Sequence, residues 1–271
     1  MHSNYHTHSH YCDGKGELRE YVEYAIQHGF THLGFSSHAP VPFPNKFAIK
    51  YEDYPIYCQE VRQLQQEYVG QIEIKLGLEI DYIPGLLDDI SPLIRQGGLD
   101  YFLGGVHLVN NPEEDPYELW FIDGPLQETY DEGLQRVFRG DVKKAVRTFF
   151  EQTWAMIQNT HPTIVAHFDK IVMHNRNRYF NPTEHWFRNL VCETAQLIQE
   201  SGCIAEINTR GLYKKRHTDF YPSAETIKYM DTLNIPVLVG TDAHEPANLN
   251  LDEGAYEFLR KIHYRNIIET I

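Results

Sequence analysis

Short apolar runs alternate with helical patterns about seven times along this chain, and this alternation constrains the fold more than any other feature. The predicted strands cover residues 5–8, 31–38, 72–81, 101–107, 163–169, 203–209 and 237–244. The segments between them repeat apolar residues with the 3.6-residue period of amphipathic helices. Strands and helices in this order form a parallel sheet, which is either open or closed into a barrel.

The predicted helices account for most of the remaining chain. They cover residues 17–28, 55–68, 86–95, 142–157, 186–198, 223–233 and 251–259. Residues 110–139 form a connection long enough to suggest a function, and their aromatic side chains favour an ordered lid. The 271 residues contain no repeat and no linker, so a single domain spanning residues 1–271 is expected.

Charge and composition exclude several classes of function. The net charge is −14, and the chain has only two short basic clusters, at residues 176–178 and 214–216. Because polyanion binding requires clustered Lys and Arg, we expect no nucleic-acid partner. No run of about 20 apolar residues is present, so no membrane segment is expected. The four cysteines form no CxxC pair and no secretory signal is recognisable, which favours the cytoplasm.

A His-x-His motif near the N-terminus suggests metal binding. In an extended strand His6 and His8 project from the same face, so both imidazoles can reach one metal ion. Asp13 follows shortly afterwards, and Gly14 permits a turn that folds Asp13 back over the same site. A solvated, histidine-rich tail is the alternative interpretation of this motif taken alone.

Further histidines and carboxylates lie at the ends of the other predicted strands, where parallel barrels build their active sites. With the N-terminal motif, the candidate metal ligands are His6, His8, Asp13, His38, Glu79, His107, His167, Asp242 and His244. These are too many for one ion with about four ligands, so we expect three divalent metal ions, with Glu79 bridging. Mixed imidazole and carboxylate ligands suit zinc, iron or manganese. Asp81 and Asp169, in the same neighbourhoods, are interpreted as supporting residues.

These motifs resemble those of a known superfamily along essentially the whole chain. The matching segments are His6-Thr7-His8 through Asp13-Gly14, Ser37-His38, Gly77-Leu78-Glu79, Gly105-Val106-His107, Ala166-His167 and Gly240-Thr241-Asp242-Ala243-His244. They resemble the polymerase-and-histidinol-phosphatase (PHP) superfamily. Residues 37–40, 206–211 and 221–223 are similar to its histidinol-phosphate phosphatases of histidine biosynthesis. The resemblance implies a distorted seven-stranded (β/α)7, TIM-like barrel with a trinuclear metal centre.

The expected reaction is hydrolysis of a phosphate monoester by a metal-held hydroxide. Clustered metals activate water and neutralise the phosphoryl charge, and no Ser-His-Asp set or Cys nucleophile stands out. Among the candidate ligands, Glu79, Asp13, His107 and Asp242 are expected to act most directly in catalysis. For the phosphoryl group, Arg210 is the first candidate contact. The competing residues are Arg176, Lys215, Arg178 and Lys214.

The resemblance implies L-histidinol phosphate as the substrate. Its ammonium and imidazole groups prefer acidic and aromatic surroundings. Such side chains occur at Phe43, Glu113, Glu114, Asp115, Trp120, Phe121 and Asp123. The alternatives are a PHP-type phosphoesterase acting on nucleotides, nucleic-acid ends or phosphotyrosine, and a catalytically inactive barrel that serves as a binding scaffold. The oligomeric state stays open.

Overall fold

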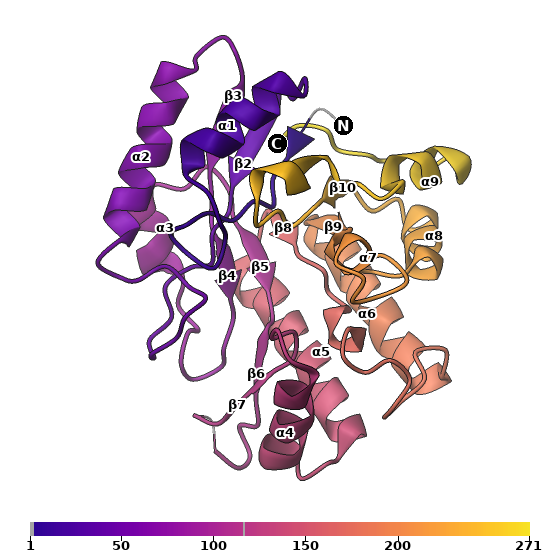
Figure 1. The fold of residues 1–271 in the computed structure, drawn as a ribbon. Helices are drawn as coiled ribbons and strands as arrows, with labels where there is room; N and C mark the ends of the chain where they lie inside the picture. Colours follow the sequence, from indigo (N-terminus) through magenta and orange to yellow (C-terminus); the bar gives the residue numbers. More distant parts are fainter. Residues whose placement is uncertain (1–2, 116) are drawn as a thin grey trace.

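Two parallel sheets contain most of the predicted strands in the computed structural model, which describes residues 3–115 and 117–271 (Figure 1). The first sheet has the order β1-β2-β3. Its strands are β1 (Ser3–Asn4), β2 (His32–Phe35) and β3 (Glu73–Leu76). The second sheet has the order β10-β9-β8-β5-β4. Its strands are β4 (Glu79–Asp81), β5 (Leu103–Gly105), β8 (Ile164–Val165), β9 (Ile204–Asn208) and β10 (Val237–Gly240).

Two isolated bridges join these sheets at both edges. His38 pairs with Glu79, and Thr7 pairs with Ala243, each in the parallel sense. Because β3 and β4 are consecutive parts of the strand predicted at 72–81, the circuit contains seven strands. The predicted distorted (β/α)7 barrel is confirmed, and the bridges decide between the open and closed sheets that the sequence pattern left open.

The core between the strands contains a buried tyrosine whose ring lies directly against two glycines. Tyr101 is buried, and its hydroxyl donates to the carbonyl oxygens of Tyr5 (2.7 Å) and Phe35 (3.1 Å). A Cβ atom at Gly77 would lie 2.5 Å from the Tyr101 ring, and one at Gly34 would collide with its hydroxyl. The predicted strand 72–81 is interrupted at residues 77–78, beside this close approach.

Helices surround the strands, with α1, α2 and α3 on one side and α6 and α8 on the other (Figure 1). The helices are α1 (Leu18–Gln27), α2 (Tyr54–Glu67), α3 (Ser91–Gly97), α5 (Val142–Thr160), α6 (His185–Ser201), α7 (Arg210–Tyr213), α8 (Ala224–Thr232) and α9 (Ala255–Lys261). Most predicted helices agree with these bounds to within a few residues. The start at residue 86 was wrong, because Ile83 and Leu87 form a bridge and Pro92 lies in the first turn of α3. The start at residue 251 was also wrong, because a 3-10 segment, η2 (Pro246–Asn250), comes before α9.

The described part of the segment at 110–139 contains two strands and a helix, and its largest aromatic side chain packs into the core. Antiparallel strands β6 (Leu108–Asn110) and β7 (Leu119–Phe121) precede α4 (Gln127–Phe138). The Trp120 indole is fully buried, donates to the carbonyl of Tyr130 (2.8 Å) and lies against Phe138. Burying these aromatic rings anchors the segment, so it is not a lid as a whole.

The two ends of the described chain meet beside β1 (Figure 1), where the amide of Ile271 donates to the hydroxyl of Tyr5. Within residues 3–115 and 117–271, every helix is too short or too polar to cross a bilayer.

Candidate metal centre

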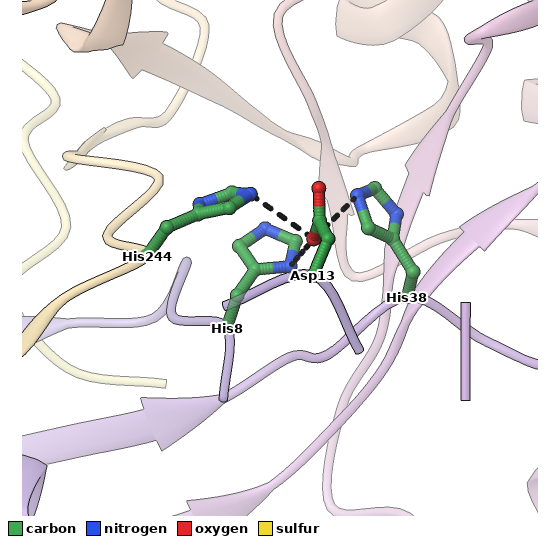
Figure 2. Close-up of side chains that lie close together, drawn as sticks. All are labelled: His8, Asp13, His38 and His244. Carbon is green, nitrogen blue, oxygen red and sulfur yellow. Dashed lines mark ion pairs between the residues drawn. The ribbon is translucent and has the colours of Figure 1, made fainter. Parts of the chain in front are cut away.

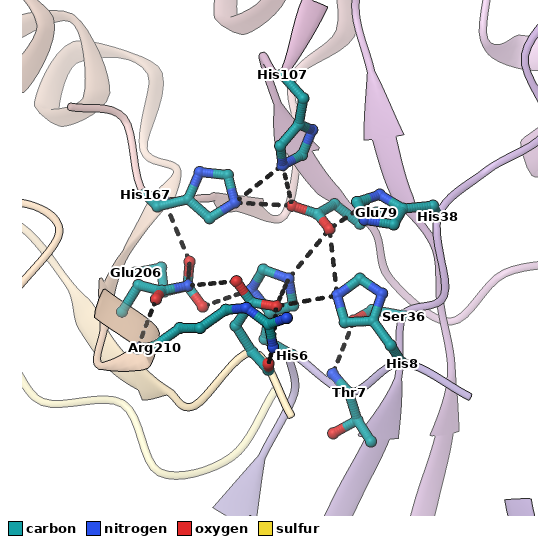
Figure 3. Close-up of polar contacts among 12 residues, drawn as sticks. His6, Thr7, His8, Ser36, His38, Glu79, His107, His167, Glu206 and Arg210 are labelled. Atoms are coloured by element: carbon teal, nitrogen blue, oxygen red, sulfur yellow. Dashed lines mark hydrogen bonds and ion pairs between the residues drawn. The ribbon is translucent and has the colours of Figure 1, made fainter. Parts of the chain in front are cut away.

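The strand ends bring the candidate ligands together around Glu79 (Figure 3). Five imidazoles have a ring nitrogen within 3.4 Å of this carboxylate. The distances are 3.1 Å for His6, 3.4 Å for His8, 3.3 Å for His38, 3.3 Å for His107 and 2.9 Å for His167. Glu79 is 1% exposed. A buried carboxylate among so many imidazoles is the arrangement expected of a residue that bridges metal ions.

His6 and His8 reach the centre from the same face of the chain that continues β1. Both are fully buried, and His8 Nε2 also lies 3.2 Å from Asp242 Oδ1. The two-residue period of an extended strand explains this common direction.

Asp13 closes one side of the cluster, between His8, His38 and His244 (Figure 2). Its Oδ1 atom lies 4.0 Å from His8 Nδ1, 3.9 Å from His38 Nε2 and 3.2 Å from His244 Nε2. The turn that returns Asp13 to the site needs glycine next to it, because a Cβ at Gly14 would lie 2.6 Å from the amide nitrogen of Ser9.

The hydrogen bonds of two histidines show that the centre fits cations. His6 Nδ1 lies 2.6 Å from Glu206 Oε1, and His107 Nδ1 lies 3.0 Å from Asp81 Oδ1. An ionised carboxylate only accepts, so both Nδ1 atoms carry a proton, and a neutral imidazole at either position presents its Nε2 lone pair to Glu79. Electron-rich atoms that face one another at this distance need a cation between them.

Several potential metal-ligand atoms inside the centre make no hydrogen bond. Among the described residues, the buried His6 Nε2, His8 Nε2 and His38 Nδ1 atoms have no hydrogen-bond partner. Four overlapping groups could each hold an ion. They are His8-Asp13-His38-His244, His6-His167-Glu206, His6-His8-Glu79 and His38-Glu79-His107. Imidazole nitrogens and carboxylate oxygens fit divalent transition metals, and the two groups that share Glu79 suit a bridging carboxylate.

His244 is held differently from His6 and His107. Arg210 Nη1 lies 2.6 Å from His244 Nδ1 and donates to the Asp242 carbonyl at 2.6 Å. Since a guanidinium only donates, His244 Nδ1 accepts, and the proton lies on Nε2, which faces Asp13. His244 therefore makes a charge-assisted contact with Asp13 in this arrangement, and its role as a ligand remains a prediction.

Neighbouring charges control ionisation in the cluster. Burial alone would raise the pKa of the Glu79 carboxyl, but the charges of His6 and His107 hold this pKa well below its usual value. Burial opposes protonation of His6, but Glu206 and Glu79 outweigh it and raise the pKa of this imidazole. A proton on His6 Nε2 and a metal ion at the same place serve the same purpose, since either one puts positive charge between this imidazole and Glu79.

Sequence reasoning missed two buried charged residues beside the cluster. Glu206 on β9 accepts from His6 and from the backbone amide of His167 at 3.1 Å. Lys170 follows the end of β8, and its Nζ atom lies 2.9 Å from Asp123 and 3.3 Å from Asp242. Glu206 occupies an inward position in the predicted strand 203–209, and that alternation was the signal available for it. No comparable signal marked Lys170.

An open pocket lies against the centre and contains only part of the predicted substrate-binding set. Arg210 and Arg216 line it, together with Phe47, Phe121 and Asp123. Arg176 and Lys215 do not line this pocket. They line a neighbouring hollow, which Arg216 also borders, so the structure does not support their predicted contact with the phosphoryl group.

Several predicted wall residues lie elsewhere. Glu113 pairs with Lys144 and Glu114 pairs with Arg139 on the exposed surface, where solvation of carboxylates is favourable. Asp115 is likewise exposed. Phe43 does not line the pocket, where Phe47 from the same loop takes its place. The substrate wall expected from 43, 113–115 and 120 was therefore wrong, because these side chains either pack in the core or face solvent.

Comparison with known proteins agrees with this geometry. The family model described as PHP domain matches residues 4–210. A relative named histidinol-phosphatase from Bacillus subtilis is 26% identical over 272 residues, with coverage of 93% of this chain and 96% of the relative. The solved structure of HisK from Listeria monocytogenes superposes with a TM-score of 0.82 at 19% identity and covers 94% of this chain and 99% of that one.

A second solved structure shows the same fold with bound molecules. It is the histidinol phosphate phosphatase of Lactococcus lactis in complex with zinc, L-histidinol and phosphate. The TM-score is 0.69 at 23% identity, and the alignment covers 98% of this chain and 95% of that chain.

Proposed function

The chain belongs to the PHP-domain family, and we propose that it is a metal-dependent phosphomonoesterase that hydrolyses L-histidinol phosphate to L-histidinol and phosphate. The observation that carries this proposal is the Glu79 cluster, in which five imidazoles converge on one buried carboxylate beside a pocket lined by arginines. The names of the relatives and the zinc, histidinol and phosphate bound by the Lactococcus lactis protein support the choice of substrate.

We propose three divalent ions in the centre, drawn from zinc, iron and manganese. The overlapping ligand groups and the bridging position of Glu79 support a multinuclear centre. When bound, such ions lower the pKa of water and neutralise charge on a phosphoryl group. Among this chain's own residues, Asp13, His107 and Asp242 complete the shells around Glu79.

Arg210 is proposed to contact the phosphoryl oxygens. Its Nη1 atom is tied to the Asp242 carbonyl and to His244, which orients the guanidinium at the edge of the pocket. Arg216 lines the same pocket, so the basic cluster at 214–216 contributes through Arg216 instead of the predicted Lys215. A planar guanidinium suits a phosphoryl group because it can donate two parallel hydrogen bonds.

The rest of the substrate is proposed to lie against Phe47 and Phe121, which line the pocket and contact each other with ring centroids 5.6 Å apart. Aromatic faces attract an imidazole or an ammonium group. A single domain and a cytoplasmic location remain part of the proposal.

Phosphate release across a panel of phosphomonoesters tests this function, using protein whose metal content is measured by elemental analysis. We expect two to three ions per chain and the highest kcat/KM for histidinol phosphate. Glu79→Gln should lose metal at more than one site and abolish release, which excludes a contaminating phosphatase. Higher kcat/KM for nucleotides, tyrosine phosphate or DNA ends under the same metal conditions would replace the proposed substrate with that alternative.

A further inference from the structure

Lys170 is a buried lysine that faces the pocket. It begins the 3-10 segment η1 (Lys170–Val172), three residues after His167, and its side chain is only 6% exposed. It nevertheless lines the same pocket as Arg210 and Arg216. A buried ammonium is costly unless it is paired, so its location requires a reason.

Two carboxylates orient the Lys170 ammonium. Its Nζ atom lies 2.9 Å from Asp123 Oδ2 and 3.3 Å from Asp242 Oδ2. An ammonium has three donors, so two are directed at these carboxylates and one remains for another acceptor. Asp242 is also a candidate metal ligand, and an oxygen that ligates a metal ion holds the ammonium less strongly.

From this geometry we propose that Lys170 contacts the phosphoryl group as a further cation beside Arg210, and that Asp123 positions its ammonium. This inference rests on the proposed phosphomonoesterase function. A phosphoryl dianion gains most from donors that are oriented before it arrives, because no reorganisation is then required. Asp123 provides that orientation from outside the metal ligands, since it lies in the connection between β7 and α4.

The ion pair between Lys170 and Asp123 also removes the repulsion between Asp123 and a phosphate ester. Asp123 Oδ2 lies 3.9 Å from His107 Nε2, so this carboxylate stands at the edge of the metal centre and faces the pocket. An unneutralised carboxylate at that position would repel a phosphate ester. Pairing with Lys170 cancels its charge and leaves the third ammonium donor for the phosphoryl group.

A purely structural role is the competing explanation. In that case Lys170 would hold Asp242 in place as a metal ligand, and its removal would lower metal content before it changed anion binding. The two roles therefore differ in the order in which metal and phosphate are lost.

The test uses metal-replete wild-type protein with the variants Lys170→Met and Lys170→Arg, and with Lys261→Met as an exposed control. Elemental analysis measures metal content, and calorimetric titration with inorganic phosphate measures affinity. We expect Lys170→Met to retain its metal and bind phosphate roughly 10- to 100-fold more weakly, the size expected for the loss of one hydrogen bond to a charged group. Lys170→Arg should recover part of the affinity, and the control should match wild type.

Unchanged phosphate affinity in Lys170→Met, or loss of metal in both Lys170 variants, would overturn the proposal. Asp123→Asn keeps the Lys170 ammonium, so it should weaken phosphate binding less than Lys170→Met does. It should still lower kcat, because the ammonium is no longer positioned. An unchanged kcat would show that Asp123 does not position Lys170. Phosphate titration does not depend on the identity of the substrate. If wild type binds phosphate but does not hydrolyse histidinol phosphate, the proposed function fails and the assignment of Lys170 is still decided.

Discussion

At the scale of single residues, the centre depends on side chains that hold the ligands as much as on the ligands. Glu206 and Asp81 accept from the Nδ1 atoms of His6 and His107 and thereby decide which nitrogen faces Glu79. Glu206 makes a further bond to the amide of His167 and so couples two imidazoles. Such partners determine both the tautomer and the orientation of a ligand.

Glu206→Gln tests whether Glu206 sets the tautomer and orientation of His6. The amide that replaces the carboxylate has lost the charge that favours the Nδ1 proton of His6, so we expect a 10- to 100-fold loss of metal affinity or activity. Metal titration of the purified variant measures the effect. Glu225→Gln is the matched control, because Glu225 is an exposed partner of Arg188. Equal metal affinity in both variants would contradict the role of Glu206.

Arg210 provides a second test at this scale. Arg210→Lys keeps the charge but loses the planar two-pronged contact, so we expect transition-state stabilisation to fall by roughly 2–4 kcal/mol. Steady-state kinetics of the lysine and alanine variants measure this loss. A near-normal rate for Arg210→Ala would transfer the phosphoryl contact to Arg216, the other arginine of the pocket.

The buried carboxyl group of Asp169 should make the free energy of unfolding depend on pH. Burial raises the pKa of this carboxyl to about 8 from 3.8, although the amide of Ser223 donates to it. Between about pH 4 and pH 8 the folded chain therefore keeps a proton that the unfolded chain has lost. Since the folded pKa is the higher one, the contribution of Asp169 to the free energy of unfolding is greatest below pH 4 and falls until about pH 8.

Asp169→Asn should remove this dependence and still accept from Ser223. Denaturant unfolding at several pH values is expected to show a shallower loss of stability between pH 5 and pH 8, by a few kcal/mol at most. Asp89→Asn is the control, since Asp89 accepts from a backbone amide on the surface and its pKa is lowered. Parallel pH profiles for wild type and Asp169→Asn would contradict the prediction.

At the scale of elements, the interruption of the third strand makes room for the packing of Tyr101. The break at residues 77–78 lies where the Tyr101 ring approaches Gly77, and Tyr57 donates to the carbonyl of Gly77 at 2.8 Å. The strand resumes at Glu79, the residue that the imidazoles surround. The backbone at Gly77 thus links barrel packing with the position of the central carboxylate.

Gly77→Ala should disturb both the packing of the barrel and the position of Glu79. Its methyl group would overlap the Tyr101 ring in a packed interior, so we expect a loss of roughly 1–3 kcal/mol in the free energy of unfolding. Chemical denaturation measures this loss, with Gly70→Ala as a control where nothing lies within 4 Å of the added Cβ. Because Gly70 has a positive φ of 78°, some cost from strain is expected there, but no loss of metal. Full metal content in Gly77→Ala would break the proposed link to Glu79.

At the scale of the whole molecule, the metal centre lies where the barrel closes. The amide of His8 donates to the carbonyl of Ala243, and the amide of Ala243 donates to the carbonyl of His6. These bonds join the first and last strands of the circuit beside His8 and Asp242. Ions held by these residues would therefore connect distant parts of the chain.

Removing the metal ions with a chelator should weaken the contacts that close the barrel. Removing one ion whose free concentration is about 1,000 times its Kd costs about 4 kcal/mol, which corresponds to a fall of roughly 10 °C in Tm. Hydrogen exchange should accelerate at the amides of His8 and Ala243 more than at α2, which lies outside the centre. Equal exchange before and after chelation, with metal loss verified, would show that closure does not depend on the ions.

The sequence alone determined the alternation of strands and helices, and with it the ends at which His38, Glu79 and His107 would appear. This was possible because strand and helix periods are local properties of the chain. The same period placed His6 and His8 on a common face. A family resemblance then implied a closed barrel.

Only the tertiary structure decided which distant side chains meet. Closure through Thr7 and Ala243 depends on register across more than two hundred residues, and no local period encodes it. Trp120 was expected at the substrate and lies in the core, whereas Lys170 is brought into the pocket by Asp123 and Asp242. Apolar burial and charge pairing act between segments that are remote in sequence, so they become visible only when those segments are packed together.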